Sequence, residues 1–193
     1  MKQRVVELTE FGKAENMRLV EADIPSPASG QIVVKNNAIG LNYLDTYFRS
    51  GLYPWPNEEK IKVLGSEGVG FVHSVGKDVK DFKEGDKVSY VTPVGAYAEY
   101  ALINAAHAVQ IKIKVNDFDV VASTLKGLTT HYLLHLTFNL KPGMTALVHA
   151  AAGGVGQLMG QWGSEIGATM IGTVGGPEKA IAAKNAGYHH VID

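Results

Sequence analysis

Cysteine is absent from the 193-residue chain, and no apolar run is long enough to form a membrane-spanning helix. Without cysteine the protein forms neither disulfides nor thiolate metal sites. The start of the chain, M-K-Q-R-V-V-E-L, lacks the apolar core of a secretory signal. These absences lead us to expect a cytoplasmic protein that does not enter a membrane.

An excess of charge of either sign is also lacking. The chain has 18 Lys and Arg residues against 19 Asp and Glu residues, for a formal net charge of −1. No basic stripe alternates with aromatic residues, so the sequence gives no electrostatic support for a nucleic-acid partner. Hydrophobic residues make up 46% of the chain, which is enough for one large domain or two small ones.

The first part of the chain has the pattern of an antiparallel β domain, with short apolar runs separated by turn clusters such as Glu84-Gly85-Asp86. We expect a barrel or sandwich over residues 1–120, interrupted by a short helix at Asn42–Phe48 and followed by a long helix at Asp117–Leu136. The predicted strands are Val5–Leu8, Met17–Val20, Gln31–Ile39, Gly68–Val75, Lys87–Val91 and Tyr97–Ile103.

The second part, residues 121–193, alternates strands and helices. Such an alternation predicts a parallel sheet, so the whole chain is expected to be an α/β protein with a β-rich first domain. Proline opens one of the helices and glycine follows its end, as is common at helix boundaries. The predicted elements are strand Ala146–Val148, helix Val155–Ile166, strand Ala168–Val174, a helix from Pro177 to near Gly187, and strand His189–Ile192.

The turn between the first strand and helix of this region resembles a dinucleotide-binding fingerprint. Ala151, Gly153 and Gly156 keep the G-x-G-x-x-G spacing, with alanine in the first position. Gly153 would let a pyrophosphate approach the backbone, and Gly156 would let the helix pack closely on the strand. The helix N-terminus adds N–H donors and a positive dipole end. The alternative is a glycine-rich turn without a ligand, but the flanking strand and helix favour the cofactor.

The end of the next strand bears on the choice of cofactor. NAD-preferring sites carry an acid there for the ribose 2′-hydroxyl, whereas this chain has Val174-Gly175-Gly176-Pro177. With Lys179 close behind, the sequence favours NADP. A solvated lysine on a helix face is the alternative interpretation of Lys179.

Five segments are similar to the medium-chain dehydrogenase/reductase superfamily, and within it to the quinone oxidoreductases related to zeta-crystallin. The resemblance implies a GroES-like β-barrel domain followed by an incomplete Rossmann domain, with NADPH and a quinone meeting in the cleft between them. The segments are A-I-G-L-N-Y-L-D-T-Y-F-R-S-G-L-Y-P (38–54), L-G-S-E-G-V-G (64–70), G-D-K-V (85–88), L-K-G-L-T (125–129) and H-A-A-A-G-G-V-G (149–156).

The same resemblance argues against a metal. Asn42 and Ser66 stand where the zinc-dependent alcohol dehydrogenases place cysteine and histidine, and the thiolates of a structural zinc lobe are missing. His131 and His135 are spaced i, i+4, but they lack the glutamate of H-E-x-x-H and an evident third ligand. We therefore expect no metal and two ordinary histidines on a helix face.

The resemblance also implies the roles of individual residues. Asn42, Asp45 and Tyr47 would line the cleft beside the nicotinamide, and Tyr53 would lie in the following loop towards the substrate. As alternatives, Asp45 can pair with Arg49 at i, i+4, and the tyrosines can simply be packing aromatics. The implied cofactor-binding residues are Asn42, Tyr47, Lys126, Thr129, Ala152, Gly153, Gly154, Val155, Gly156, Thr173, Gly175 and Lys179.

Three functions are compatible with these motifs. The first is NADPH-dependent, zinc-independent reduction of quinones, and the second is reduction of enoyl or alkenal substrates. The third is a non-catalytic structural or RNA-binding role, since some zeta-crystallin relatives have one. Family members continue well beyond the position of Asp193 and often form homodimers, so we expect only the first part of the Rossmann domain here. The chain by itself is then not expected to hold a complete active site.

Overall fold

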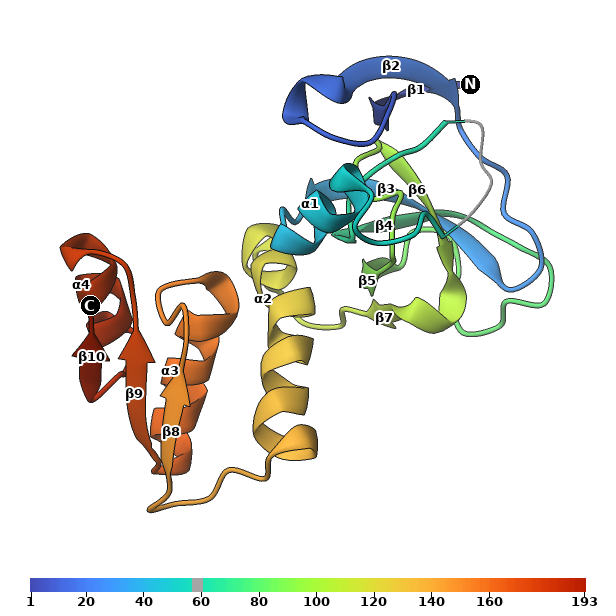
Figure 1. Ribbon diagram of the computed structural model, residues 1–193. Helices are drawn as coiled ribbons and strands as arrows, with labels where there is room; N and C mark the ends of the chain where they lie inside the picture. The colour runs from blue at the N-terminus through green and yellow to red at the C-terminus, as the bar shows by residue number, and fades with distance from the viewer. Residues whose placement is uncertain (57–60) are drawn as a thin grey trace. The chain divides into compact units, whose positions relative to one another are not determined.

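The computed structural model describes residues 1–56 and 61–193. The described residues form two compact units, Met1–Leu125 and Lys126–Asp193, which can be followed by colour in Figure 1. The division predicted after residue 120 lies earlier in the same helix, α2 (Asp117–His131). Each unit is described separately below.

The first unit is built from antiparallel strands. β1 pairs with β2, and a second sheet has the strand order β6-β3-β4-β5-β7. The predicted β-rich architecture is therefore present. The elements up to the end of this unit are β1 (Lys2–Leu8), the 3₁₀ turn η1 (Ala14–Asn16), β2 (Met17–Asp23), β3 (Gln31–Ile39), α1 (Tyr43–Ser50), β4 (Glu67–Val75), β5 (Lys87–Val91), β6 (Tyr100–Asn104), the 3₁₀ turn η2 (Ala105–His107), β7 (Ala108–Gln110) and the start of α2 (Asp117–His131).

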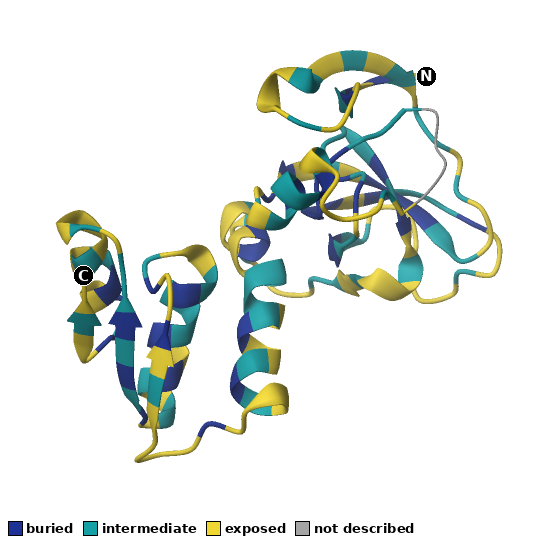
Figure 2. Cartoon of the chain, viewed as in Figure 1, coloured by how far each residue is buried: buried dark blue, intermediate teal, exposed yellow. Residues whose placement is uncertain are grey.

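β3 and β4 lie at the centre of the five-stranded sheet. The β-branched run Ile32, Val33 and Val34 is buried on both faces of β3, and such a continuous apolar run is typical of a strand whose two faces are both covered. Figure 2 shows buried residues along these central strands. The first turns of α2 pack against the sheet through Val120 and Val121, which join a buried cluster with strand residues. This packing fixes the position of α2 within the first unit.

One predicted strand is wrong at its start. The strand expected over Tyr97–Ile103 is β6, which begins only at Tyr100. Residues before it bond to β1 instead: Tyr97 accepts from the Val6 N–H at 2.8 Å, and the Glu99 N–H donates to Arg4 at 3.2 Å. The chain therefore passes from one sheet to the other within the predicted strand. The short strand β7 was not predicted.

The second unit is a parallel sheet with helices, as the alternating pattern predicts. Its strands have the order β10-β9-β8, and α3 packs on β9 while α4 packs on β10. Pro177 opens α4, and Gly167 ends α3 with a φ of 88°. The elements are the π-helical turn η3 (Tyr132–Thr137), β8 (Thr145–Val148), α3 (Gly154–Ile166), β9 (Thr169–Thr173), α4 (Pro177–Asn185) and β10 (His190–Ile192).

The helix predicted over Asp117–Leu136 is correct only in its first part. The α-helix α2 ends at His131, and the wider π-helical turn η3 follows it. π-Helical hydrogen bonding occurs mostly as a single turn, a π-bulge, within an α-helix. Here Leu134 in the turn and Leu140 after it belong to the same buried cluster. The wider turn thus lets both leucines reach the core of the second unit.

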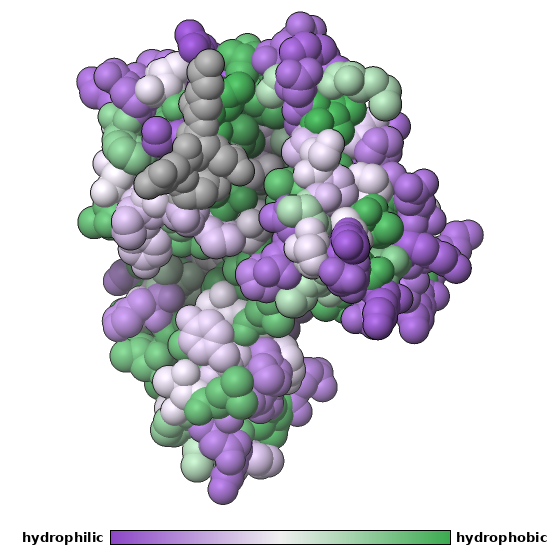
Figure 3. Space-filling view, turned by 90° about the vertical axis from the view of Figure 1, so that its right-hand side faces the viewer, coloured by the Kyte–Doolittle hydropathy of each residue, from purple (hydrophilic) through white to green (hydrophobic). Residues whose placement is uncertain are grey.

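Among the described residues, no helix combines the length and the apolar character that a bilayer crossing requires. Hydrophobic and hydrophilic residues are interspersed on the face drawn in Figure 3.

Candidate active site

The site residues expected in the first unit gather at the start of α1. Asn42 is the N-cap of this helix, and its backbone N–H donates to Asp45 Oδ2 at 2.8 Å. In return, the Asp45 N–H donates to the carbonyl of Asn42 at 3.1 Å. Gly51 ends the helix in the left-handed region with a φ of 78°. The first turn of α1 thereby holds Asn42 and Asp45 in a fixed relation.

Asp45 is buried inside this unit. Its carboxylate accepts from the Ser66 hydroxyl at 2.7 Å and from the Tyr97 hydroxyl at 2.7 Å. Arg49, which was the alternative partner, donates instead to the carbonyl of Gly12 at 3.1 Å. Asp45 therefore organises the interior around α1 and is not half of a surface ion pair.

Tyr97 shares this carboxylate. Burial raises the pKa of the Tyr97 hydroxyl well above its usual range. The hydrogen bond to Asp45 and the negative charges of Asp45 and Glu67 raise this pKa further. The Tyr97 hydroxyl therefore keeps its proton and remains a donor at neutral pH. Sequence reasoning missed Tyr97, because nothing in the sequence links it to a residue 52 positions away.

The two tyrosines predicted for the substrate side lie next to each other. The ring centroids of Tyr47 and Tyr53 are 5.3 Å apart, and the Tyr53 N–H donates to the Tyr47 carbonyl at 3.1 Å. Phe48 holds the Tyr53 ring edge-on at 5.6 Å. Tyr53 is 43% exposed, so part of this residue faces solvent.

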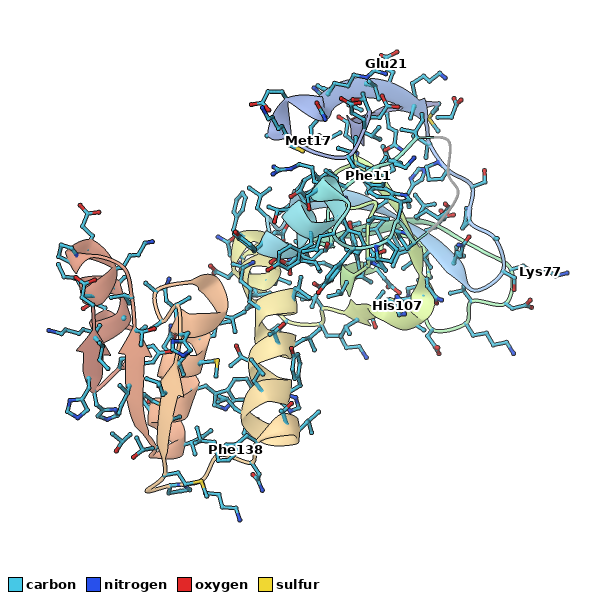
Figure 4. The ribbon with its side chains drawn as sticks, viewed as in Figure 1. Phe11, Met17, Glu21, Lys77, His107 and Phe138 are labelled. Atoms are coloured by element: carbon cyan, nitrogen blue, oxygen red, sulfur yellow. The ribbon has the colours of Figure 1, made fainter. Side chains whose placement is uncertain are left out.

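The Asn42 side chain is bonded to a residue without a predicted role. Its Nδ2 donates to Glu67 Oε1 at 2.7 Å. Glu67 lies inside the quoted segment L-G-S-E-G-V-G, which is the one sequence signal that could have identified it. A pocket of about 330 Å³ is lined by Asn42, Asp45 and Tyr97 together with apolar residues such as Met17. Figure 4 shows Met17 close to α1.

In the second unit, the glycine turn has the geometry that its spacing predicts. A Cβ on Gly156 would lie 2.4 Å from the carbonyl oxygen of Ala150 and 2.8 Å from backbone atoms of Ala151. The Ala151 N–H bonds to the carbonyl of Thr173 at 3.0 Å and ties the turn to β9. Only glycine fits at 156, because α3 approaches the end of β8 so closely.

The start of α3 fits a dinucleotide phosphate. Gly153 is the N-cap of this helix, and it is exposed. A Cβ there would lie 3.1 Å from the Ala150 carbonyl oxygen, so the lack of a side chain keeps the backbone open to a ligand. The N-terminus of α3 contributes a positive dipole end and N–H groups directed along its axis.

Lys126, for which the family resemblance implies a contact with the cofactor, lies beside this turn. A Cβ on Gly154 would lie 2.7 Å from Cδ and 2.9 Å from Cε of Lys126. The lysine side chain therefore runs across the backbone of the turn within the second unit. Thr129, a helical turn further along α2, is half-buried.

The end of β9 carries the remaining predicted contacts. Thr173 Oγ1 is 2.9 Å from Nδ1 of His149 at the end of β8, and Lys179 is exposed on α4. An unexpected carboxylate also lies here, since Asp193 Oδ1 accepts from the Gly176 N–H at 2.5 Å. Asp193 directly follows the third strand, β10 (His190–Ile192), whereas the sequence pattern places the acid after the second strand.

The histidine pair lies in a ring cluster. His131 and His135 have ring centroids 5.2 Å apart, and Trp162 on α3 lies 5.1 Å from His135. Among residues 1–56 and 61–193, no group of three or more His, Cys, Asp or Glu residues is arranged to hold a metal ion. The two imidazoles pack against the indole as aromatic neighbours.

Comparisons with known proteins point to one family. Residues 28–114 match the alcohol dehydrogenase GroES-like domain. The chain is 43% identical over 189 residues to a quinone oxidoreductase of Pseudomonas aeruginosa, covering 97% of this chain and 58% of the relative. It is 40% identical over 186 residues to a 2-haloacrylate reductase of a Burkholderia species, covering 94% of this chain and 56% of that protein.

A solved structure agrees with both units. The Escherichia coli quinone oxidoreductase complexed with NADPH gives a TM-score of 0.89 at 40% identity, over 100% of this chain and 58% of that one. The chain thus spans a little over half the length of the curated relatives that it matches.

Proposed function

Because the chain belongs to the medium-chain dehydrogenase/reductase superfamily, we propose that it serves the NADPH-dependent reduction of quinones without zinc. The observation that carries the proposal is the phosphate-binding turn before α3, in a chain that matches quinone oxidoreductases over 97% of its length. We assign the substrate side to the unit Met1–Leu125 and the cofactor side to the unit Lys126–Asp193.

The cofactor assignment follows the second unit. Residues 152–156 would hold the pyrophosphate at the α3 N-terminus, and the Lys126 ammonium would add a positive charge beside them. Thr173, Gly175 and Lys179 would contact the adenosine end, and Thr129 the nicotinamide end. The complex of the Escherichia coli relative with NADPH supports this choice of cofactor.

The chemistry asked of the protein is modest. When bound, NADPH supplies a hydride from C4 of its nicotinamide to an electron-poor ring. The side chains position the reactants and donate hydrogen bonds to the oxygen on which negative charge develops. The Asn42 amide and the hydroxyls of Tyr47 and Tyr53 are the proposed donors. Asp45 is buried beneath α1, which favours a positioning role for it over contact with the substrate.

The hydrogen bonds of the first unit support a site without zinc. Ser66 directs its hydroxyl to Asp45, and Asn42 directs its amide to Glu67. Amide and hydroxyl groups are poor zinc ligands compared with thiolate and imidazole. Both residues act as hydrogen-bond donors within the unit, as a site that works without a metal requires.

A second candidate is the reduction of α,β-unsaturated carboxylates or carbonyls. It is favoured by the similarity to 2-haloacrylate reductase, which is nearly as high as that to the quinone oxidoreductases. Both reactions deliver a hydride to an electron-poor carbon and stabilise negative charge on a conjugated oxygen. The phosphate turn does not distinguish the two reactions, because both use the same cofactor. The choice between them therefore depends on the residues that contact the substrate.

One assay separates the candidates. NADPH oxidation by the purified full-length protein is followed with 1,4-benzoquinone, with 2-haloacrylate and with an alkenal. The proposal expects the highest kcat/KM with the quinone. A higher value with 2-haloacrylate would transfer the assignment to the second candidate, and no acceleration with any substrate would refute both. Light scattering of the same sample tests our further proposal that the whole protein is a homodimer.

A further inference from the structure

Glu67 carries a carboxylate in a fully buried position, with 0% of the residue exposed. Burying an ionised group costs free energy unless donors compensate for its lost hydration. Asn42 Nδ2 donates to Oε1 at 2.7 Å, the Leu125 N–H donates to Oε2 at 2.8 Å, and both bonds contribute to this compensation. The donors come from two different elements, so the two bonds prevent rotation of the carboxylate.

The surrounding backbone leaves room for this carboxylate. A Cβ on Gly40 would lie 2.2 Å from Oε1 and 2.5 Å from Cγ of Glu67. The Gly40 N–H also donates to the backbone carbonyl of Glu67 at 3.2 Å. Any side chain at position 40 would displace the Glu67 carboxylate. Glycine at this position therefore allows Glu67 to reach Asn42.

The carboxylate determines how the Asn42 amide is turned. An ionised carboxylate only accepts hydrogen bonds, so it must face the –NH₂ group of the amide and not its oxygen. From the other side, the Asn42 N–H bonds to Asp45, which fixes the backbone of the same residue. Both the position and the orientation of the Asn42 amide are therefore determined within the first unit.

We propose that Glu67 is the positioning residue that accepts one N–H of the Asn42 amide and so keeps its other N–H in the orientation needed by the reacting substrate oxygen. This inference rests on the function proposed above, in which Asn42 is a donor to the developing oxyanion. If the amide reversed, its carbonyl oxygen would replace its donors and would repel the charge that it is meant to stabilise.

Glu67→Gln tests the proposal with little change in size. Glutamine offers one acceptor and one donor group, so it can satisfy both Leu125 and Asn42 only if the Asn42 amide reverses. We expect kcat for quinone reduction to fall at least tenfold, with kcat/KM falling equally and the Kd for NADPH unchanged. This kinetic signature marks an interaction made in the transition state. An unchanged kcat in a folded Glu67→Gln variant would overturn the proposal.

A double variant separates orientation from stability. In Glu67→Gln with Asn42→Asp, the glutamine amide can donate to the new carboxylate, so the hydrogen bond is restored with its direction reversed. We expect the melting temperature to equal that of Glu67→Gln, in which the reversed Asn42 amide also satisfies the glutamine. We expect kcat to stay low, because position 42 has lost its donors. Recovery of kcat to the wild-type value would show that any bonded pair suffices, and would overturn the proposal.

Ser89→Ala is the matched control. Ser89 is buried in the same sheet, and its hydroxyl lies 2.7 Å from the Thr124 hydroxyl of α2. Its loss removes a buried hydrogen bond between the sheet and α2 without touching Asn42. We expect a lower melting temperature with wild-type kcat. A tenfold loss of kcat in this variant as well would reduce Glu67 to a general structural role.

A spectroscopic measurement needs no turnover. In the wild-type protein, the Asn42 side-chain amide protons should resonate downfield of ordinary asparagine amides, because their acceptor is charged. Asn42→Ser assigns the signals. An ordinary shift would refute the positioning role even in an inactive protein. A downfield shift without quinone turnover would refute the proposed function alone, and would leave the Glu67–Asn42 orientation established.

Discussion

The hydroxyl of Tyr188 donates a hydrogen bond of 2.7 Å to the carbonyl of Gly156. It links the segment after α4 to the glycine at which α3 meets the end of β8. Because both groups are buried, Tyr188→Phe should lower the free energy of unfolding by about 1 kcal/mol. Denaturant titration measures this change, and a variant as stable as the wild type would show that the bond contributes nothing.

The same tyrosine predicts a pH dependence of stability. Burial raises the pKa of Tyr188 to about 12, above the value of about 10 for an exposed tyrosine. Between these values the unfolded chain loses the proton while the folded protein keeps it. The free energy of unfolding should therefore fall as the pH rises from 10 to 12. The fall should be smaller in Tyr188→Phe, and equal slopes for the two proteins would contradict the shift.

Gly156→Ala should be strongly destabilising. The added methyl would lie 2.4 Å from the Ala150 carbonyl oxygen, and backbone atoms cannot move aside as a flexible side chain can. We expect a loss of about 1–3 kcal/mol in the free energy of unfolding. Gly175→Ala is the control, since a Cβ there has no atom within 4 Å and should change stability by no more than about 0.5 kcal/mol. Equal effects of the two substitutions would contradict the close approach of α3.

Gly153→Val tests the phosphate-binding turn directly. Its side chain would occupy the space at the α3 N-terminus where the pyrophosphate is expected. Calorimetric titration should then show no binding of either NADPH or NADH, with the fold retained by circular dichroism. Wild-type affinity in this variant would show that the turn before α3 does not hold the pyrophosphate.

The exposed Lys179 should matter for one cofactor more than for the other. We expect NADPH to bind at least tenfold tighter than NADH, or about 1.4 kcal/mol. Lys179→Ala should weaken NADPH more than NADH, because the ammonium meets only the 2′-phosphate. Salt should likewise weaken NADPH more steeply. Titration of both cofactors at two salt concentrations checks this, and a parallel loss for both would assign Lys179 to solvent.

The Asp193 carboxylate, at the same edge of the sheet, should also affect the relative affinities for NADPH and NADH. Its carboxylate bonds to Gly176, near the proposed 2′-phosphate position, where a negative charge opposes a phosphate. Asp193→Asn should therefore increase the ratio of NADPH to NADH affinity. A falling ratio would show that the acid helps to order the turn more than it repels the phosphate.

Local sequence patterns determined most of the elements and the phosphate turn. Helix starts and ends are set by residues such as Pro177 and Gly167, whose backbone preferences act without distant partners. The turn before α3 needs glycines at a fixed spacing, because a strand and a helix meet there at close range. Such features depend on neighbours in the chain and can be predicted from the order of residues alone.

Tertiary structure decided the features that join distant segments. The Asp45–Tyr97 and Glu67–Asn42 bonds join residues 52 and 25 positions apart, and no local pattern encodes them. The late start of β6 has the same origin, because Tyr97 bonds to β1. The π-helical turn η3 depends on Leu134 and Leu140 sharing one core. The sequence itself determined which residues can act as hydrogen-bond donors and acceptors. Packing decided which of these donors and acceptors meet, because a buried polar group must bond to a partner that the fold places within hydrogen-bond distance.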